Sequence, residues 1–183
     1  TNVNEWAFTS DDSQGWFVGS ATGNTNSDGS TPHSMYFSNN GGLTNSYTGN
    51  GTTENYAYAT MKVQFGSAAE YDFSFDWKCA GEGTVDYAAV YIVPNTVVVP
   101  NAGFPTGGVT LAARLNLDTT WQHVVIPLSG ATYDTTAKKI IIVWTNNGTV
   151  NNSPAIAIDN VSIVENACPY VGGVTATVSG LTA

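Results

Sequence analysis

The sequence predicts an all-β protein, folded as a jelly-roll-type antiparallel β-sandwich, and three observations lead to this class. Apolar residues recur with a period near two along most of the chain, the spacing that places them on one face of a strand. Clusters of Gly, Asn, Ser and Asp, which favour turns, separate the alternating segments. No segment carries the i, i+3, i+4, i+7 stripe of a helix longer than one turn.

The N-terminal part of the chain predicts short strands separated by polar loops. The strands are expected over residues 5–8, 16–19 and 34–38. The stretches 20–32 and 41–55 hold too few apolar side chains to enter a core, so we expect both to be surface loops.

The middle of the chain holds the clearest strands. Residues 71–79 alternate strictly between an apolar face and a polar face. The apolar face consists of Tyr71, Phe73, Phe75, Trp77 and Cys79, and the polar face of Asp72, Ser74, Asp76 and Lys78. Residues 57–65 repeat the pattern, with Ala57, Ala59, Met61, Val63 and Phe65 on the apolar face. We expect each of these strands to be buried on one side only.

Further strands are expected to complete the two sheets, over residues 87–93, 111–115, 121–127, 138–145 and 156–164. The connection 94–108 combines consecutive valines with prolines and glycines, a composition compatible with an edge strand closed by proline. Long loops on a rigid sandwich are common places for binding surfaces.

Residues 1–165 are expected to form this one sandwich, since 183 residues suit a single all-β domain. The alternation breaks at residues 166–169 and resumes over residues 174–178. Residues 166–183 therefore predict a linker entering the first strand of another domain, with a last strand of the same sandwich as the alternative. The first residues lack the basic and apolar regions of a signal peptide, so we expect mature or excised material.

The charge pattern argues against two classes of partner. Fourteen acidic residues oppose five scattered basic ones, which gives a formal net charge of −9. Nucleic acids and anionic membranes require clustered Lys or Arg, whereas divalent cations suit an acidic surface. No apolar run approaches the length of a membrane helix, which needs ~20 residues. The low charged fraction of 10% and the many Asn and Thr residues favour an extracellular location.

The two cysteines leave two alternatives open. A disulfide between Cys79 and Cys168 would close a long loop, worth roughly 4 kcal/mol in the chain-entropy model. Otherwise one is a buried thiol and the other an exposed one, because the sequence does not show whether their β-carbons face each other.

The sequence contains no recognisable catalytic motif. It has no Gly-x-Ser-x-Gly elbow, no His-Glu-x-x-His helix and no phosphate-binding glycine loop. His33 lies in a polar loop, and His123 alternates with the apolar Val124 and Ile126, so both are expected to be surface histidines. A carboxylate pair for glycoside hydrolysis has no local spacing rule, and nothing in the sequence points to one. We therefore expect a protein that is not an enzyme.

Three runs of residues, in this order and spacing, resemble a known family. They are Ser38-Asn39-Asn40-Gly41-Gly42, then Phe75-Asp76-Trp77-Lys78-Cys79 with Gly81-Glu82 and Asp86-Tyr87 after it, and finally Ala157-Ile158-Asp159-Asn160-Val161-Ser162-Ile163. Together they resemble the choice-of-anchor J, or cleaved-adhesin, domains of bacterial surface proteins, which are similar to MAM domains. The resemblance covers roughly residues 5 to 168. It implies a jelly-roll sandwich, often followed by a fibronectin-type-III domain, in exported adhesins or beside the catalytic domain of secreted peptidases.

The resemblance also implies a structural calcium ion. On residue pattern alone, Asp159 shares its expected face with Val161 and Ile163, so we expect its carboxylate to point inward and to need a cation or several hydrogen bonds. Weaker candidates for the same or another hard-cation site, for which a solvated turn is the alternative, are Asn39, Asn40, Glu82 and Asp86. Family members often carry Asp where this chain has Asn40 and Asn147, and fewer carboxylates bind calcium less tightly.

Two kinds of role follow from these expectations. In the first, the sandwich binds a glycan or a host protein through its loops and exposed aromatic side chains. The candidate aromatic residues, for which a place in the core or on a strand face is the alternative, are Trp16, Tyr36, Tyr47 and Tyr56. In the second, the domain is a spacer or assembly unit of a larger surface protein or filament, with the neighbouring domains of the same polypeptide as its partners. An accessory role beside a secreted peptidase or glycoside hydrolase is a further option.

Overall fold

The structure is a computed structural model that describes residues 6–10, 13–24, 32–49, 53–67, 70–133, 135–148 and 151–166. Ten strands and one short helix occur in this part of the chain. The strands are β1 (Ala7–Ser10), β2 (Gly15–Gly19), β3 (Ser34–Ser38), β4 (Asn55–Gln64), β5 (Glu70–Cys79), β6 (Tyr87–Pro94), β7 (Val109–Leu115), β8 (Asp118–Ser129), β9 (Ala137–Asn146) and β10 (Ala157–Glu165), and the helix is α1 (Gly130–Tyr133).

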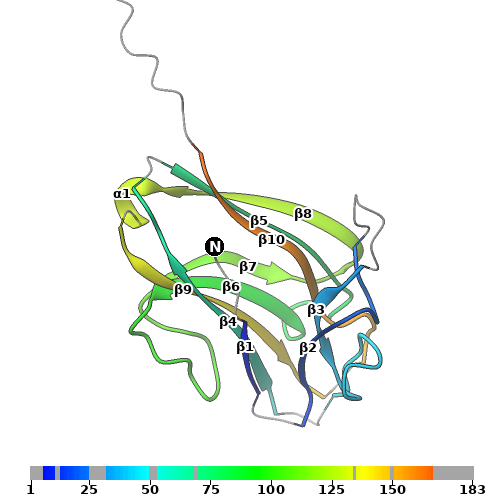
Figure 1. Ribbon diagram of the computed structural model, residues 1–183. Helices are drawn as coiled ribbons and strands as arrows, with labels where there is room; N and C mark the ends of the chain where they lie inside the picture. The colour runs from blue at the N-terminus through cyan, green and yellow to red at the C-terminus, as the bar shows by residue number, and fades with distance from the viewer. Residues whose placement is uncertain are drawn as a thin grey trace, which may run out of the picture.

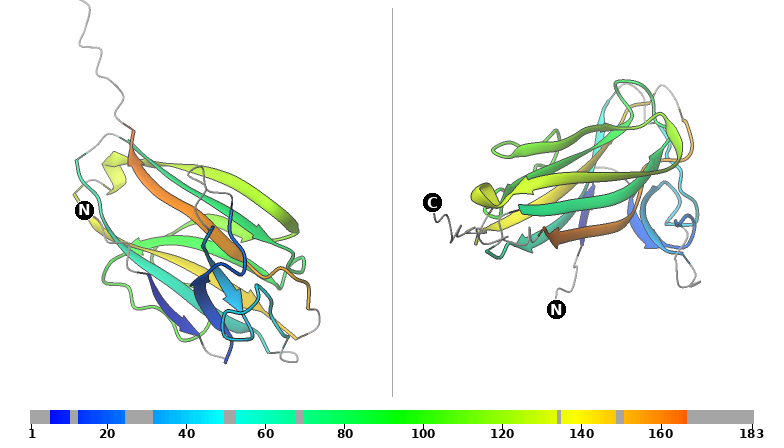
Figure 2. Two further views of the ribbon diagram at one scale, coloured as in Figure 1. Left: turned by 45° about the vertical axis from the view of Figure 1, so that its right-hand side comes forward. Right: turned by 90° about the horizontal axis from the view of Figure 1, so that it is seen from above.

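Two antiparallel sheets stack face to face (Figure 1). The first sheet has five strands in the order β1-β4-β9-β6-β7, and the second sheet has five in the order β2-β3-β10-β5-β8. The two layers can also be followed in the rotated views of Figure 2. The all-β sandwich predicted from the alternating sequence is confirmed.

Alternating side chains fill the space between the sheets. Phe73 and Phe75 of β5 are fully buried in this main core, as are Ile142 and Trp144 of β9. Full burial of one such side chain is worth about 1.5–3 kcal/mol, so the inward faces of the two sheets hold the layers together. Trp77, on the same expected face, is partly buried at the margin of this core.

The outer face of the first sheet carries a second, smaller core. Ile141 and Val143 of β9 point outward, yet both are fully buried beneath the connection between β6 and β7. Val97 and Val99 of that connection pack against them. The valine-rich segment is therefore a covering loop and not the edge strand that its composition allowed. Both faces of β9 are covered, which explains its continuous apolar run from Ile140 to Trp144.

The outer face of the second sheet is covered in part by the segment that follows β3. The Tyr36 hydroxyl donates a hydrogen bond to the Gly42 carbonyl at 2.5 Å. Gly42 has a φ of 85°, in the left-handed region, and a β-carbon at this position would lie 3.0 Å from the Phe17 ring. Glycine is therefore the residue that lets this segment approach the sheet closely.

The expected linker and following strand, residues 166–183, lie outside the described residues except for Asn166. Within the described part of the chain, no helix has the length and apolar character needed to cross a membrane.

Candidate functional site

Three of the four aromatic residues expected at a binding surface lie in the interior. Trp16, Tyr36 and Tyr47 are at most 5% exposed. The Trp16 ring packs in the main core, and the Tyr47 ring lies 5.2 Å from that of Trp144. Trp16 and Tyr47 therefore take the core alternative, whereas Tyr36 is buried on the outer face of the second sheet beneath the segment after β3. Tyr56 is the member of the set that stays accessible.

Tyr47 and Asp86 form a buried hydrogen-bond network that joins separate loops. The Tyr47 hydroxyl donates to Asp86 Oδ2 at 2.8 Å, and the Asn147 backbone N–H donates to Asp86 Oδ1 at 2.9 Å. The Asn152 N–H donates in turn to the Tyr47 hydroxyl at 3.1 Å. Burial raises the pKa of Asp86, and burial together with the Asp86 carboxylate raises the pKa of Tyr47. Asp86 is thus a structural anchor with no exposed surface.

The other expected metal ligands have partners of their own. The side-chain amides of Asn39 and Asn40 bond to the hydroxyls of Thr48 and Thr44 at 2.6 and 2.8 Å. Glu82 lies in the turn that leads to Asp86. In the portion of the chain that the structure covers, no group of three or more His, Cys, Asp or Glu side chains is placed to hold a metal ion. Calcium binding by the predicted ligands, which include the asparagines, stays a prediction.

Asp159 faces outward on the second sheet, contrary to the expectation that it points inward. It lies directly opposite Asp76 of β5, and opposite residues of an antiparallel pair share a face. The cause is a β-bulge at Asn160, whose φ of 50° is left-handed. The extra residue shifts the alternation by one position, so Ile158 and Val161 contact the core in its place.

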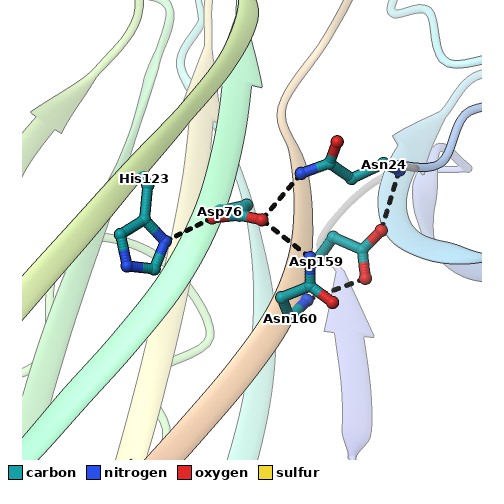
Figure 3. Close-up of polar contacts among 5 residues, drawn as sticks. All are labelled: Asn24, Asp76, His123, Asp159 and Asn160. Carbon is teal, nitrogen blue, oxygen red and sulfur yellow. Dashed lines mark hydrogen bonds and ion pairs between the residues drawn. The ribbon is translucent and has the colours of Figure 1, made fainter. Parts of the chain in front are cut away.

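Asp159 belongs to a polar cluster on this outer face, made of Asn24, Asp76, His123, Asp159 and Asn160 (Figure 3). The Asp76 carboxylate is its centre, because Oδ2 accepts hydrogen bonds from the side-chain amides of Asn24 and Asn160, each at 2.7 Å. Its Oδ1 lies 2.6 Å from His123 Nδ1. Asp159 accepts the backbone N–H groups of Asn24 and Asn160 at 2.9 and 2.7 Å.

The hydrogen bonds decide the charge state of Asp76. Burial raises the pKa of this carboxyl group, but hydrogen bonds from Asn160, His123 and Asn24 outweigh burial and lower the pKa below its usual value. The His123 side chain is 61% exposed, which confirms the predicted surface histidine.

The polar cluster fastens the segment after β2 onto the sheet. Asn24 reaches both carboxylates, and the neighbouring Gly23 carbonyl accepts a hydrogen bond from the Trp121 indole at 3.2 Å. The Lys78 ammonium lies 4.8 Å from the centroid of the Trp121 ring. Because these groups hydrogen-bond to one another, the polar cluster holds the segment after β2 against the sheet.

Cys79 is a free thiol in the main core. Burial raises the pKa of this thiol well above its usual value. Cys168 lies outside the described residues. Of the two alternatives for the cysteines, the structure has the buried thiol at Cys79.

The outer face of the first sheet carries an aromatic cluster, defined here as Tyr56, Tyr87, Tyr91 and Phe104. Phe104, from the covering loop, is its centre, with ring centroids 5.6, 5.9 and 6.0 Å from those of Tyr56, Tyr87 and Tyr91. All four side chains are partly exposed. The exposed Arg114 of β7 lies 5.5 Å from the centroid of the Tyr87 ring. Tyr56 and Tyr87 flank Thr145 on either side in the sheet register, so the strands fix their spacing.

Tyr56 and Tyr91 of this cluster are neutral hydrogen-bonding groups. Burial and the neighbouring Glu54 carboxylate, which accepts the Tyr56 hydroxyl proton in a hydrogen bond, raise the pKa of Tyr56 to about 12. Burial also raises the pKa of Tyr91. Near neutral pH both phenols therefore keep their protons and can donate hydrogen bonds.

Sequence reasoning found Tyr56 and missed the other members of this cluster. Tyr87 and Tyr91 are four residues apart on one strand, so period-two alternation already places them on one face. No sequence pattern pointed to Phe104, because its position depends on how the covering loop folds back over the sheet.

No protein-family model and no curated protein sequence matches the chain. Several solved structures share its fold. A protein from a study of promiscuous carbohydrate-binding modules of the β-sandwich superfamily matches with a TM-score of 0.53 and 10% identity, over 90% of this chain and 58% of that chain. The K1 cleaved adhesin domain of Lys-gingipain from Porphyromonas gingivalis W83 matches with a TM-score of 0.50 and 16% identity, over 88% of this chain and 90% of that chain.

An enzymatically active domain also shares the fold. Tailspike protein 4 of bacteriophage CBA120 matches with a TM-score of 0.52 and 14% identity, over 89% of this chain and 20% of that chain. At these identities the matches establish the sandwich fold, which carbohydrate-binding modules and a cleaved-adhesin domain share with this chain.

Proposed function

We propose that the chain is a non-catalytic, extracellular binding module that recognises glycans through the aromatic cluster. The observation that carries this proposal is the group of four partly exposed aromatic rings beside an exposed arginine on the outer face of a sheet. The strand framework holds three of the rings in place, so little conformational freedom is lost on binding.

The chemistry of the cluster suits sugar rings. The apolar C–H faces of a pyranose pack against aromatic rings, while tyrosine hydroxyls and the Arg114 guanidinium donate hydrogen bonds to sugar hydroxyls. The shared fold with carbohydrate-binding modules supports the same proposal.

A glycan array followed by calorimetric titration tests the proposal. We expect binding to at least one neutral oligosaccharide, and an affinity loss of about tenfold for Tyr87→Ala or Phe104→Ala, since each variant removes one ring. Phe17→Ala is the matched control, because Phe17 is a partly exposed aromatic residue on the second sheet. An array with no signal above background at high protein concentration rejects glycan binding and leaves the spacer or assembly role.

We also propose that the chain is part of an exported surface protein of the choice-of-anchor J type. The shared fold with a cleaved-adhesin domain supports this. The complete reading frame separates the options, because tandem copies favour an adhesin or filament that contacts host protein or glycan, whereas a peptidase or glycoside hydrolase alongside favours an accessory module.

Calcium binding, which the family resemblance implies, stays a proposal with Asp159 as its carboxylate. Thermal unfolding in calcium chloride and in chelator is the test, because a ligand that binds the folded state raises the unfolding midpoint. A rise that Asp159→Asn abolishes supports the proposal, and an unchanged midpoint rejects it.

A further inference from the structure

A pocket opens on the outer face of the first sheet, between the edge strand β1 and the covering loop. Its volume is about 300 Å³, and Thr9, Ser10, Tyr58, Val99, Pro100 and Asn101 line it. Ligand pockets span about 300–1,000 Å³, so a pocket at the small end of this range suits one sugar ring.

The elements on both sides of the pocket are held in place. Tyr58 is almost fully buried, and its hydroxyl donates to the Gly103 carbonyl at 2.9 Å. The same loop is tied down again by the Lys139 ammonium, which donates to the Val97 carbonyl at 2.7 Å. The strand side of the pocket is fixed by pairing, since Thr9 lies directly opposite Tyr58. The pocket is thus bounded by two anchored elements.

The chemistry of the lining selects an uncharged, polyhydroxylated ligand. Val99 and Pro100 offer apolar surface, whereas Thr9, Ser10 and Asn101 offer hydroxyl and amide groups. No Asp, Glu, Lys, Arg or His is among the described residues that line the pocket. A neutral sugar ring, with apolar C–H faces and a rim of hydroxyls, matches both features.

The pocket adjoins the aromatic cluster along β4. Tyr56 of the cluster and Tyr58 of the pocket occupy successive outward positions of this strand, which are roughly 7 Å apart. The covering loop makes a second link, since it supplies Asn101 to the pocket and Phe104 to the cluster. A glycan with one ring in the pocket therefore reaches the cluster with its next rings.

We infer that this pocket is a subsite for one neutral sugar ring of the glycan that the aromatic cluster binds. This inference rests on the proposed function and adds the location of one subsite and the chemical class of the sugar that it binds. A uronic acid ring is disfavoured, because no cation lines the pocket to balance its carboxylate.

The test uses the full chain, isotope-labelled for NMR, and the methyl glycosides of glucose, xylose and galactose, with methyl glucuronide as the charged comparison. We expect at least one neutral glycoside to shift the amide signals of Thr9, Ser10 and Asn101, and to bind about tenfold more tightly than the glucuronide. Asn101→Trp fills the pocket and lowers that affinity at least about tenfold. Val98→Trp, in the same loop at an 84% exposed position, keeps it within about twofold.

Tyr87→Ala separates the subsite from the cluster. Tyr87 does not line the pocket, so this variant weakens oligosaccharide binding and leaves the methyl glycoside shifts unchanged. If Tyr87→Ala weakens oligosaccharide binding while Asn101→Trp behaves like Val98→Trp, the subsite is wrong and the proposed function stands. If neither oligosaccharides nor methyl glycosides bind, both are rejected.

Discussion

Two carboxylates of this protein, Asp76 and Asp86, are both buried yet differ in pKa. Burial dominates at Asp86 and raises its pKa, whereas hydrogen bonds outweigh burial at Asp76 and lower its pKa. A carboxyl group with a raised pKa favours the folded state most below the ordinary value of about 3.9, and its contribution declines as the pH rises through the raised pKa. A group with a lowered pKa behaves in the opposite way.

Removal of the Asp86 carboxylate is predicted to destabilise the fold. Asp86→Ala leaves the Tyr47 hydroxyl and the Asn147 N–H without their acceptor, and each unsatisfied buried group costs about 1–3 kcal/mol. We expect the free energy of unfolding in urea to fall by about 2–4 kcal/mol. Thr84→Ala, an exposed change in the same turn, is the control and stays within about 0.5 kcal/mol. Equal unfolding curves for both variants would contradict the anchoring role of Asp86.

The Asp76 carboxylate is predicted to make stability depend on acid. Its lowered pKa stabilises the fold above about pH 4, and this contribution disappears as the pH falls through the folded-state pKa. Asp76→Asn removes the titrating group, so the stability difference from the parent chain is largest near neutral pH and shrinks in acid. Denaturation curves at several pH values measure it. Ser74→Ala, a non-titrating change on the same face of β5, is the control, and its stability difference from the parent chain is expected not to vary with pH. A stability difference for Asp76→Asn that also did not vary with pH would argue against the stabilising role of the polar cluster.

At the scale of elements, the bulge in β10 turns Asp159 toward the polar cluster. Asn160 holds a left-handed φ of 50° and also donates its amide to Asp76. Asn160→Gly loses the hydrogen bond but removes the β-carbon from the left-handed conformation, whereas Asn160→Ala loses the hydrogen bond and keeps a β-carbon there, at ~1–2 kcal/mol relative to glycine. We expect the alanine variant to unfold more easily than the glycine variant in chemical denaturation. The reverse order would show that the backbone conformation is not what fixes the bulge.

Individual strands and loops show how far the sequence predicts this fold and its site. Alternation placed Phe73, Phe75 and His123 correctly, because strand periodicity is local. It placed Asp159 on the wrong face, because the extra residue at the Asn160 bulge shifts the alternation, so that Asp159, before the bulge, does not share a face with Val161 and Ile163 after it. It also missed Phe104, whose position depends on tertiary folding of a loop.

At the scale of the whole molecule, loops fasten to the outer faces of both sheets. On the second sheet, Asn24 in the segment after β2 donates a hydrogen bond to Asp76, and the Gly42 carbonyl in the segment after β3 accepts one from Tyr36. On the first sheet the covering loop leaves four aromatic rings partly exposed and forms the pocket with β1. The first sheet therefore presents the more suitable surface for a ligand, and the second sheet the more self-contained one.

The overall charge predicts how binding responds to salt. The chain has a net charge of −9 with five scattered basic residues, and the described residues that line the pocket carry no charge. Raising the salt from 0.1 M to 1 M shortens the Debye length from about 10 Å to about 3 Å, which weakens exposed ionic contacts but not ring packing. We therefore expect the Kd for a neutral oligosaccharide to change by less than about twofold in titrations across this range, and heparin to show no binding. A steep fall in affinity with salt would mean that an anionic partner, held through Arg114 and the lysines, is the true ligand.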